Sequence, residues 1–113
     1  MANKMKLIIA IVQDEDANRL ISSLMADGFS VTKLATTGGF LRAGNTTLLI
    51  GIEETKLESA MKIIESTCKS RKQIATSPSP ITGTTGVYVP YPVEVTVGGA
   101  TIFVLDVDQF VRV

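Results

Sequence analysis

The order of helical and extended apolar patterns constrains the fold of this chain more than any other feature of its sequence. Two segments, residues 14–27 and 54–69, place apolar side chains on one face at helical spacing, which predicts two amphipathic helices. The predicted buried faces carry Ala17, Leu20, Ile21, Leu24 and Met25 in the first helix, and Leu57, Ala60, Met61, Ile64 and Cys68 in the second.

The ends of both helices carry recognisable residues. Asp14 offers an N-cap for the first helix, with two further acids in its first turn, and Gly28 follows as the glycine expected after a helix C-terminus. A cap is a better interpretation of these acids than a divalent-ion site. Thr55 and Glu58 match the capping-box spacing near the start of the second helix.

Extended segments lie between and after the helices. Apolar and β-branched runs predict strands over residues 6–12, 29–36 and 46–52. Val93, Val95 and Val97 alternate with polar residues, and Gly98-Gly99 then predicts a two-residue hairpin turn into a last strand over 100–107.

This order predicts an α+β, ferredoxin-like βαββαβ fold with an elaboration before its last strand. Two helices would cover one face of an antiparallel sheet. The opposite face needs cover as well, because the strands are apolar beyond strict alternation. A chain of 113 residues has no third layer to supply that cover, so we expect self-association.

Residues 70–92 differ from the rest in composition. They contain all four prolines and are rich in serine, threonine and glycine, which predicts a long excursion from the body of the domain. A connection this long in a compact domain is usually functional or mobile. Parts of it, such as 73–76 and 86–89, could form an extended ribbon.

Composition narrows the class of protein. The length fits a single domain over residues 1–113, and 11 basic residues balance 11 acidic ones, which argues against a nucleic-acid binder. The sequence has no histidine, so the usual general base and the commonest metal ligand are missing, and we expect neither catalytic residues nor a metal site. Cys68, the single cysteine, is expected in the core. No apolar run is long enough to span a bilayer, and we expect a cytoplasmic protein without membrane insertion.

The short loop over residues 37–45 is the strongest candidate for a binding site. It places Phe40 and Leu41 together at its centre, where a solvated hairpin connection would be polar. An aromatic ring flanked by glycines suits a planar ligand with anionic oxygens, and Asn45 could pair with an adenine edge. Residues 39–46 resemble a P-loop but lack its lysine and precede a strand, so nucleotide triphosphate hydrolysis is rejected. From spacing alone, ligand binding and subunit contact remain alternatives.

Residues 34–47, Leu-Ala-Thr-Thr-Gly-Gly-Phe-Leu-Arg-Ala-Gly-Asn-Thr-Thr, form a highly specific segment. Together with Ile8-Ile9-Ala10-Ile11-Val12-Gln13-Asp14, this segment resembles the PII-like cyclic di-AMP receptors of Gram-positive bacteria, the PstA or DarA family. The resemblance extends over essentially the whole chain, including Gly98 to Val104. It implies a homotrimer with one cyclic di-AMP in each of three clefts between subunits and no other cofactor. Residues 37–45 would be a short T-loop, and residues 70–92 an extended B-loop-like excursion.

The resemblance also implies a set of ligand-binding residues. They are Thr32, Gly39, Phe40, Leu41, Arg42, Asn45, Gly51 and Phe103. Asn45 would bond an adenine, Gly51 would lie near a base, and Phe103 would contribute from the last strand. Relatives often carry arginine at position 30, where this chain has Ser30. Two alternatives follow: the affinity is lower, or Arg42 supplies the cationic contact. Gln109 and Arg112 are alternatives for a residue that closes over the ligand.

The resulting expectation is a signalling receptor in which the ligand orders both loops and alters what an unidentified downstream protein contacts. Two alternatives remain at this point. One is a PII-type sensor of ATP or another nucleotide, and the other is a trimeric interaction module that needs no ligand.

Overall fold

A computed structural model describes residues 4–34, 44–80 and 88–113, with the backbone alone over 75–80 and 88–91. The elements are β1 (Met5–Gln13), α1 (Asp14–Ala26), β2 (Val31–Leu34), β3 (Asn45–Glu53), the 3₁₀ turn η1 (Glu54–Lys56), α2 (Leu57–Cys68), β4 (Arg71–Pro80), β5 (Tyr88–Val97) and β6 (Ala100–Asp106). Strands β2, β3, β1 and β6 form one antiparallel sheet in that order. The predicted ferredoxin-like βαββαβ fold is therefore confirmed.

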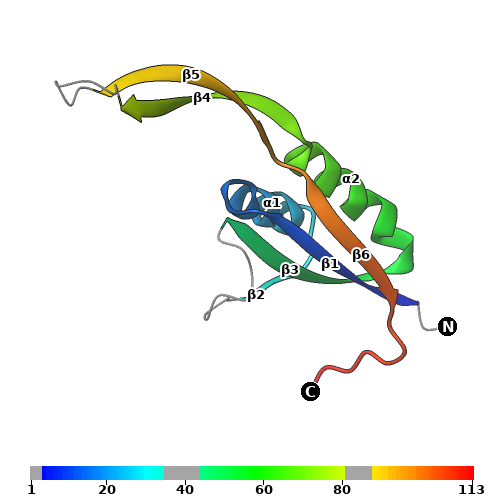
Figure 1. Cartoon of the computed structure of the whole chain (residues 1–113). Coiled ribbons are helices and arrows are strands. Elements are labelled where there is room, and N and C mark those ends of the chain that lie inside the picture. The colour runs from blue at the N-terminus through cyan, green and yellow to red at the C-terminus, as the bar shows by residue number, and fades with distance from the viewer. Residues whose placement is uncertain (1–3, 35–43, 81–87) are drawn as a thin grey trace.

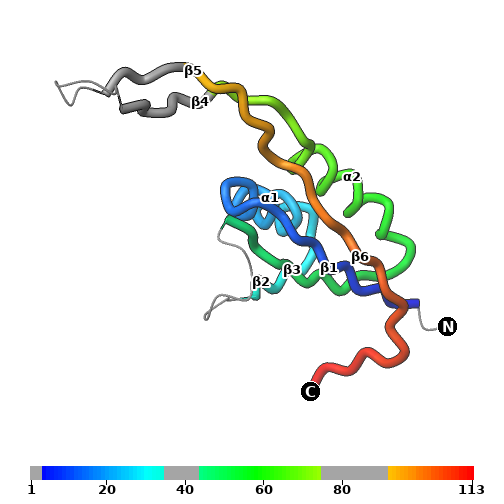
Figure 2. The backbone as a smooth tube through the Cα atoms, viewed as in Figure 1, coloured from blue at the N-terminus to red at the C-terminus, as the bar shows by residue number. Residues whose placement is uncertain are grey.

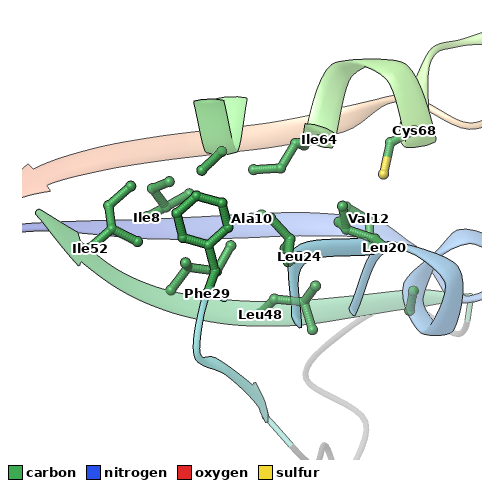
Figure 3. Packing of buried hydrophobic residues seen from close by; sticks show 13 residues of the cluster. Ile8, Ala10, Val12, Leu20, Leu24, Phe29, Leu48, Ile52, Ile64 and Cys68 are labelled. Atoms are coloured by element: carbon green, nitrogen blue, oxygen red, sulfur yellow. The ribbon is translucent and has the colours of Figure 1, made fainter. Parts of the chain in front are cut away.

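Both helices pack on the same face of this sheet (Figure 1). Every second residue of β1, from Ile8 to Val12, is buried beneath them, as are Leu48 and Ile50 of β3. Leu20 and Leu24 of α1 and Ile64 of α2 close the core from the helix side (Figure 3). Full burial of one such aliphatic side chain contributes about 1.5–3 kcal/mol, so this cluster dominates the stability of the body.

The predicted helix faces are largely confirmed. Ala17 lies in the core with the leucines of α1, and Ala60 and Cys68 lie there with Ile64 of α2. The prediction that Met25 lies on the buried face is wrong, because 61% of its surface is exposed near the end of α1.

The predicted N-cap of the first helix is wrong, whereas the predicted glycine after its C-terminus is confirmed. Asp14 is the first residue of α1 rather than its N-cap, and the residue in the cap position, Gln13, makes no capping bond with its side chain. The Asp14 carboxylate does not cap the helix but accepts a hydrogen bond from the Thr46 hydroxyl of the neighbouring strand β3. Gly28 does follow α1, with a φ of 87°, and its N–H donates to the Met25 carbonyl.

The predicted capping box at the second helix is wrong. Thr55 lies inside the turn η1, and the N-cap of α2 is Lys56, which makes no side-chain capping bond. The chain enters α2 through this 3₁₀ turn, so the residues with capping-box spacing lie one residue too early.

Strands β4 and β5 form a separate two-stranded sheet, here called the arm, that projects away from the body (Figure 1). The arm gives the molecule an extended shape, with principal extents of 74 × 30 × 20 Å. Its register pairs Arg71 with Val97 at the root. The ribbon expected within residues 70–92 therefore exists, although β5 continues to Val97.

The predicted hairpin turn at Gly98-Gly99 is wrong. Strand β5 pairs with β4, and β6 pairs with β1, so the two glycines join strands of different sheets (Figure 2). Both glycines have positive φ values, 85° and 88°. Their backbone contacts the end of α2, where the Gly99 N–H donates to the Cys68 carbonyl. A glycine pair signals a sharp change of direction but does not say which strands lie on either side.

The face of the sheet opposite the helices is open in this chain. Leu7, Ile9 and Ile11 of β1 point toward it and are only half-buried. Phe103 and Leu105 of β6 lie on the same face with 54% and 44% of their surface exposed. The second apolar face expected from the strand sequences is thus present.

Neither helix of the described chain is long and apolar enough to cross a membrane.

Candidate ligand-binding site

Four of the eight predicted ligand-binding residues lie in the described part of the chain: Thr32, Asn45, Gly51 and Phe103. The other four, Gly39, Phe40, Leu41 and Arg42, lie outside the described residues. The register places all four described residues on the open face of the sheet. They therefore share a face, although they do not share a single location.

Thr32 and Phe103 lie in one row across the sheet, but at its opposite edges. Thr32 of β2 pairs with Leu49, Leu49 pairs with Ile9, and Ile9 pairs with Phe103 of β6. Three strand spacings separate the two outer residues, which is roughly 14 Å. The two side chains therefore do not touch each other within one chain.

Asn45 and Gly51 lie at opposite ends of β3. They are six positions apart along an extended strand, which corresponds to roughly 20 Å. The predicted residues thus divide into two half-sites, one at the Asn45 end of the open face and one at the Gly51 end.

The half-site at Gly51 contains a cavity of about 220 Å³. Its lining includes Ser30, Lys56, Phe110 and Arg112 besides Gly51. The Arg112 guanidinium lies 5.7 Å from the centre of the Phe110 ring, within the range of a cation–π interaction. A Cβ at Gly51 would meet no atom within 4 Å, so this glycine opens the strand backbone to whatever covers the face.

Arg112, one of the two alternatives for a residue that closes over the ligand, lines this cavity, and that role stays a prediction for both Arg112 and Gln109. Arg112 and Ser30 line the same cavity, and Ser30 is the position where relatives often carry arginine. Sequence reasoning did not identify Lys56 or Phe110. Both are brought here by the fold, Lys56 from the turn before α2 and Phe110 from the tail after β6.

The tail that carries Phe110 and Arg112 is held where it leaves the sheet. Lys6 donates a hydrogen bond to the Asp106 carboxylate, and the Val107 N–H donates to the Met5 carbonyl at 3.2 Å. The hydrogen bond from Lys6 lowers the pKa of Asp106 and raises that of Lys6. Both groups are therefore charged throughout the neutral range.

The half-site at Asn45 contains a cavity of about 450 Å³, lined by Gln13, Asp14, Glu15, Gly44, Asn45 and Val97. Asn45 is the first residue of β3 and pairs directly with Gln13 of β1. The residues on either side of it are fixed to α1, because the Asp14 N–H donates to the Gly44 carbonyl at 2.8 Å and the Thr46 hydroxyl donates to the Asp14 carboxylate. The backbone on both sides of Asn45 is accordingly fixed to the start of α1.

A buried carboxylate lies next to this half-site. Asp16 is fully buried, and Arg71 at the root of the arm donates to it at 2.8 Å while Arg19 donates at 3.1 Å. The hydrogen bond to Asp16 raises the pKa of Arg71. Sequence reasoning placed Asp16 only at a helix start, because its partner Arg71 is 55 residues away.

Cys68 is confirmed as a core residue, with 1% of its surface exposed. Burial raises the pKa of its thiol to about 11, so the thiol stays protonated and unreactive at neutral pH. Within residues 4–34, 44–80 and 88–113, no group of acidic or cysteine side chains is arranged to hold a metal ion.

The fold of this chain is similar to that of PII proteins. It matches the structure of Arabidopsis thaliana PII bound to citrate with a TM-score of 0.58 and 20% identity, over 99% of this chain and 82% of that one. The B. subtilis GlnK–ATP complex matches with a TM-score of 0.55 and 16% identity, over 95% of this chain and 84% of that one. At these identities the likeness concerns the fold.

The particular family follows from the sequence. A family model described as cyclic-di-AMP receptor matches residues 5–113, and the chain belongs to that family. A protein of unknown function from Pediococcus pentosaceus ATCC 25745 is 45% identical, with a TM-score of 0.77 over 99% of this chain and 100% of that one.

Proposed function

We propose that this protein is a cytoplasmic signalling receptor that binds cyclic di-AMP in clefts between the subunits of a homotrimer, and that it acts without catalysing a reaction. The family and the PII-like fold both support this function. Binding would order the short loop over residues 37–45 and the excursion over 70–92, and so change the surface offered to a downstream protein.

The observation that carries the intersubunit site is the division of the candidate residues into two half-sites. Roughly 20 Å of strand separates Asn45 from Gly51, and roughly 14 Å of sheet separates Thr32 from Phe103. Two copies that meet through their open faces or strand edges can bring the Asn45 end of one copy to the Gly51 end of the next. A closed ring of such heterologous contacts is a cyclic oligomer, and a trimer is the smallest ring of this kind.

The chemistry of the two half-sites suits the two parts of the ligand. Lys56 and Arg112 at the Gly51 end can neutralise a phosphate, and Arg112 takes the cationic role that Ser30 lacks. Asn45 at the other end can donate to and accept from an adenine edge. Phe40 and Leu41 of the short loop would stack on the base, and Gly39 and Arg42 would contact the phosphates.

Calorimetry with cyclic di-AMP tests this function on matched asparagine variants. Asn45→Ala should weaken binding at least tenfold, about 1.4 kcal/mol, because it removes the hydrogen bonds to the base. Asn18→Ala, on the exposed side of α1, should stay within about twofold of the wild type, since it leaves the half-site intact. Equal affinities of the two variants, or a wild-type Kd above about 1 mM, would contradict the proposal.

A second variant, at Gly51, tests whether the ligand and a neighbouring subunit cover the open face of the sheet. Gly51→Val should fold normally, because its side chain would enter open space and suits a strand. It should nevertheless lose most of the ligand affinity by filling the cavity lined by Arg112.

Analytical ultracentrifugation tests the oligomeric state, and the wild type should sediment with a mass three times that of the 12.1 kDa chain. Displacement of cyclic di-AMP by ATP would favour the alternative of a PII-type ATP sensor.

A further inference from the structure

The junction between β1 and α1, residues Gln13 to Asp16, contacts both segments that a ligand is expected to order. On one side it holds the end of the short loop, through the hydrogen bond from the Asp14 N–H to the Gly44 carbonyl at 2.8 Å. On the other side it holds the root of the arm. Its side chains bond to Thr46 at the first contact and to Arg71 and Gly98 at the second.

Two side chains of this junction bind the arm. The Gln13 side-chain oxygen Oε1 accepts a hydrogen bond from the Gly98 N–H at 2.7 Å. The Asp16 carboxylate accepts from Arg71, which pairs with Val97 in the arm. The first contact holds the strand that leaves the arm, and the second holds the strand that enters it.

Gln13 also belongs to the Asn45 half-site. The two residues are directly opposite in the β1–β3 register, which puts their Cβ atoms about 4.5–5.5 Å apart on the same face. Both line the cavity of about 450 Å³, together with Val97 of the arm. A ligand group that bonds Asn45 therefore lies against the Gln13 amide.

We propose that Gln13 is a positioning residue that couples ligand binding at Asn45 to the orientation of the arm, an inference that rests on the function proposed above. Its amide oxygen accepts the hydrogen bond from the Gly98 N–H. A ligand that packs against this amide shifts it, and so strengthens or weakens the bond to Gly98. The arm then turns at Gly98-Gly99, the two adjacent residues with positive φ. The coupling is reciprocal, so a protein that holds the arm changes ligand affinity by the same factor.

Hydrogen exchange at the Gly98 and Gly99 amides, with and without saturating cyclic di-AMP, tests this coupling. In the wild type the ligand should change the exchange rate at Gly98 several-fold. Gln13→Leu should exchange about tenfold faster without ligand, because Gly98 loses its acceptor, and the ligand should no longer alter the rate. Gln13→Glu keeps an acceptor oxygen at the same place and should restore the protection seen without ligand. Gln73→Leu, the same change at an exposed residue of the arm, should respond to ligand as the wild type does.

The outcomes separate the coupling from the binding function. A purely structural role of Gln13 would raise exchange equally in both ligand states, leave the ligand-dependent difference in Gln13→Leu, and overturn the coupling. Calorimetric binding by the wild type without any change at Gly98 would also overturn the coupling while leaving the receptor function standing. Absence of calorimetric binding by the wild type would overturn the receptor function, and the coupling with it.

Discussion

The body and the arm are built from the same kind of extended strand, yet they are held in place by different forces. Strand β1 of the body pairs on both edges and buries every second side chain under two helices. The arm is a two-stranded ribbon in which Ile74 is 76% exposed, and an isolated ribbon of two strands is marginally stable in water. The body is therefore stabilised by apolar burial, whereas the arm depends on polar contacts at its root.

This difference assigns separate roles to the two regions. A packed core resists small perturbations, because its side chains have few alternative arrangements. The root of the arm consists of the Gln13–Gly98 bond, the Asp16–Arg71 pair and the Gly99–Cys68 bond. Ligand binding can make or break a few polar contacts such as these. The arm is therefore the region whose orientation we expect to change on binding.

The largest expected difference between body and arm comes from replacing one isoleucine by alanine in each region. Ile64→Ala should lower the free energy of unfolding by about 2–5 kcal/mol, because it leaves a cavity in the core. Ile74→Ala should change it by less than about 0.5 kcal/mol, since this side chain is largely in solvent. Urea denaturation measures both. Similar losses would show that the arm is packed as tightly as the body.

The next largest effect is expected at the glycines that join the arm to β6. A Cβ at Gly98 would lie 2.6 Å from both the Lys69 carbonyl oxygen and an Arg71 guanidinium nitrogen. Gly98→Ala should therefore destabilise the root by about 2 kcal/mol or more, whereas Gly99→Ala, with an equally positive φ but open space around it, should lose about 1 kcal/mol. Hydrogen exchange of the amides in β4 and β5 separates the two. Equal effects would mean that backbone conformation alone matters there.

The buried carboxylate should have an intermediate effect. Asp16→Asn removes the charge that holds Arg71 and Arg19 and should lower stability by about 1–3 kcal/mol. Glu58→Gln is the control, because its pair with Lys62 is 3.9 Å long and exposed on both sides, and it should matter by less than about 0.5 kcal/mol. Thermal denaturation of the two variants gives the difference. If the loss in Asp16→Asn were as small as in the control, the arm root would need another anchor.

The smallest effect is expected from Cys68, at the end of α2, on the free energy of unfolding at alkaline pH. The pKa of Cys68 is raised from 9.0 to about 11 in the folded chain, so the unfolded chain loses this proton first and stability falls as pH rises above about 9. The contribution should reach about 1.4 kcal/mol at pH 10. Urea denaturation of the wild type and Cys68→Ala between pH 8 and 10 should show a slope that the variant lacks. Parallel pH profiles would contradict the burial of this thiol.

Much of the fold could be predicted from the sequence, because hydrophobic periodicity is a local property. The buried faces of both helices and the apolar strands 6–12 and 46–52 were predicted closely, and Met25 was the one misplaced core residue. The caps at Asp14 and Thr55 were predicted wrongly, because spacing does not show that Thr46 competes for Asp14 or that a 3₁₀ turn precedes α2.

The candidate site could be predicted only in part. Motif resemblance supplied Asn45, Gly51, Thr32 and Phe103, and the structure adds that they lie at opposite ends and edges of one open face. Lys56 and Phe110 carry no recognisable pattern, and only the folded chain brings them beside Gly51. The roles of all eight residues in ligand binding remain predictions.

The sequence by itself determined the order of elements, the two-layer body and the family, because these follow from patterns among neighbouring residues. The tertiary structure decided what happens on either side of Gly98-Gly99, and it brought Gln13 to Gly98 across 85 residues and Asp16 to Arg71 across 55. Such contacts join single side chains from distant segments and leave no periodic trace in the sequence. They become visible only when burial has brought the segments together.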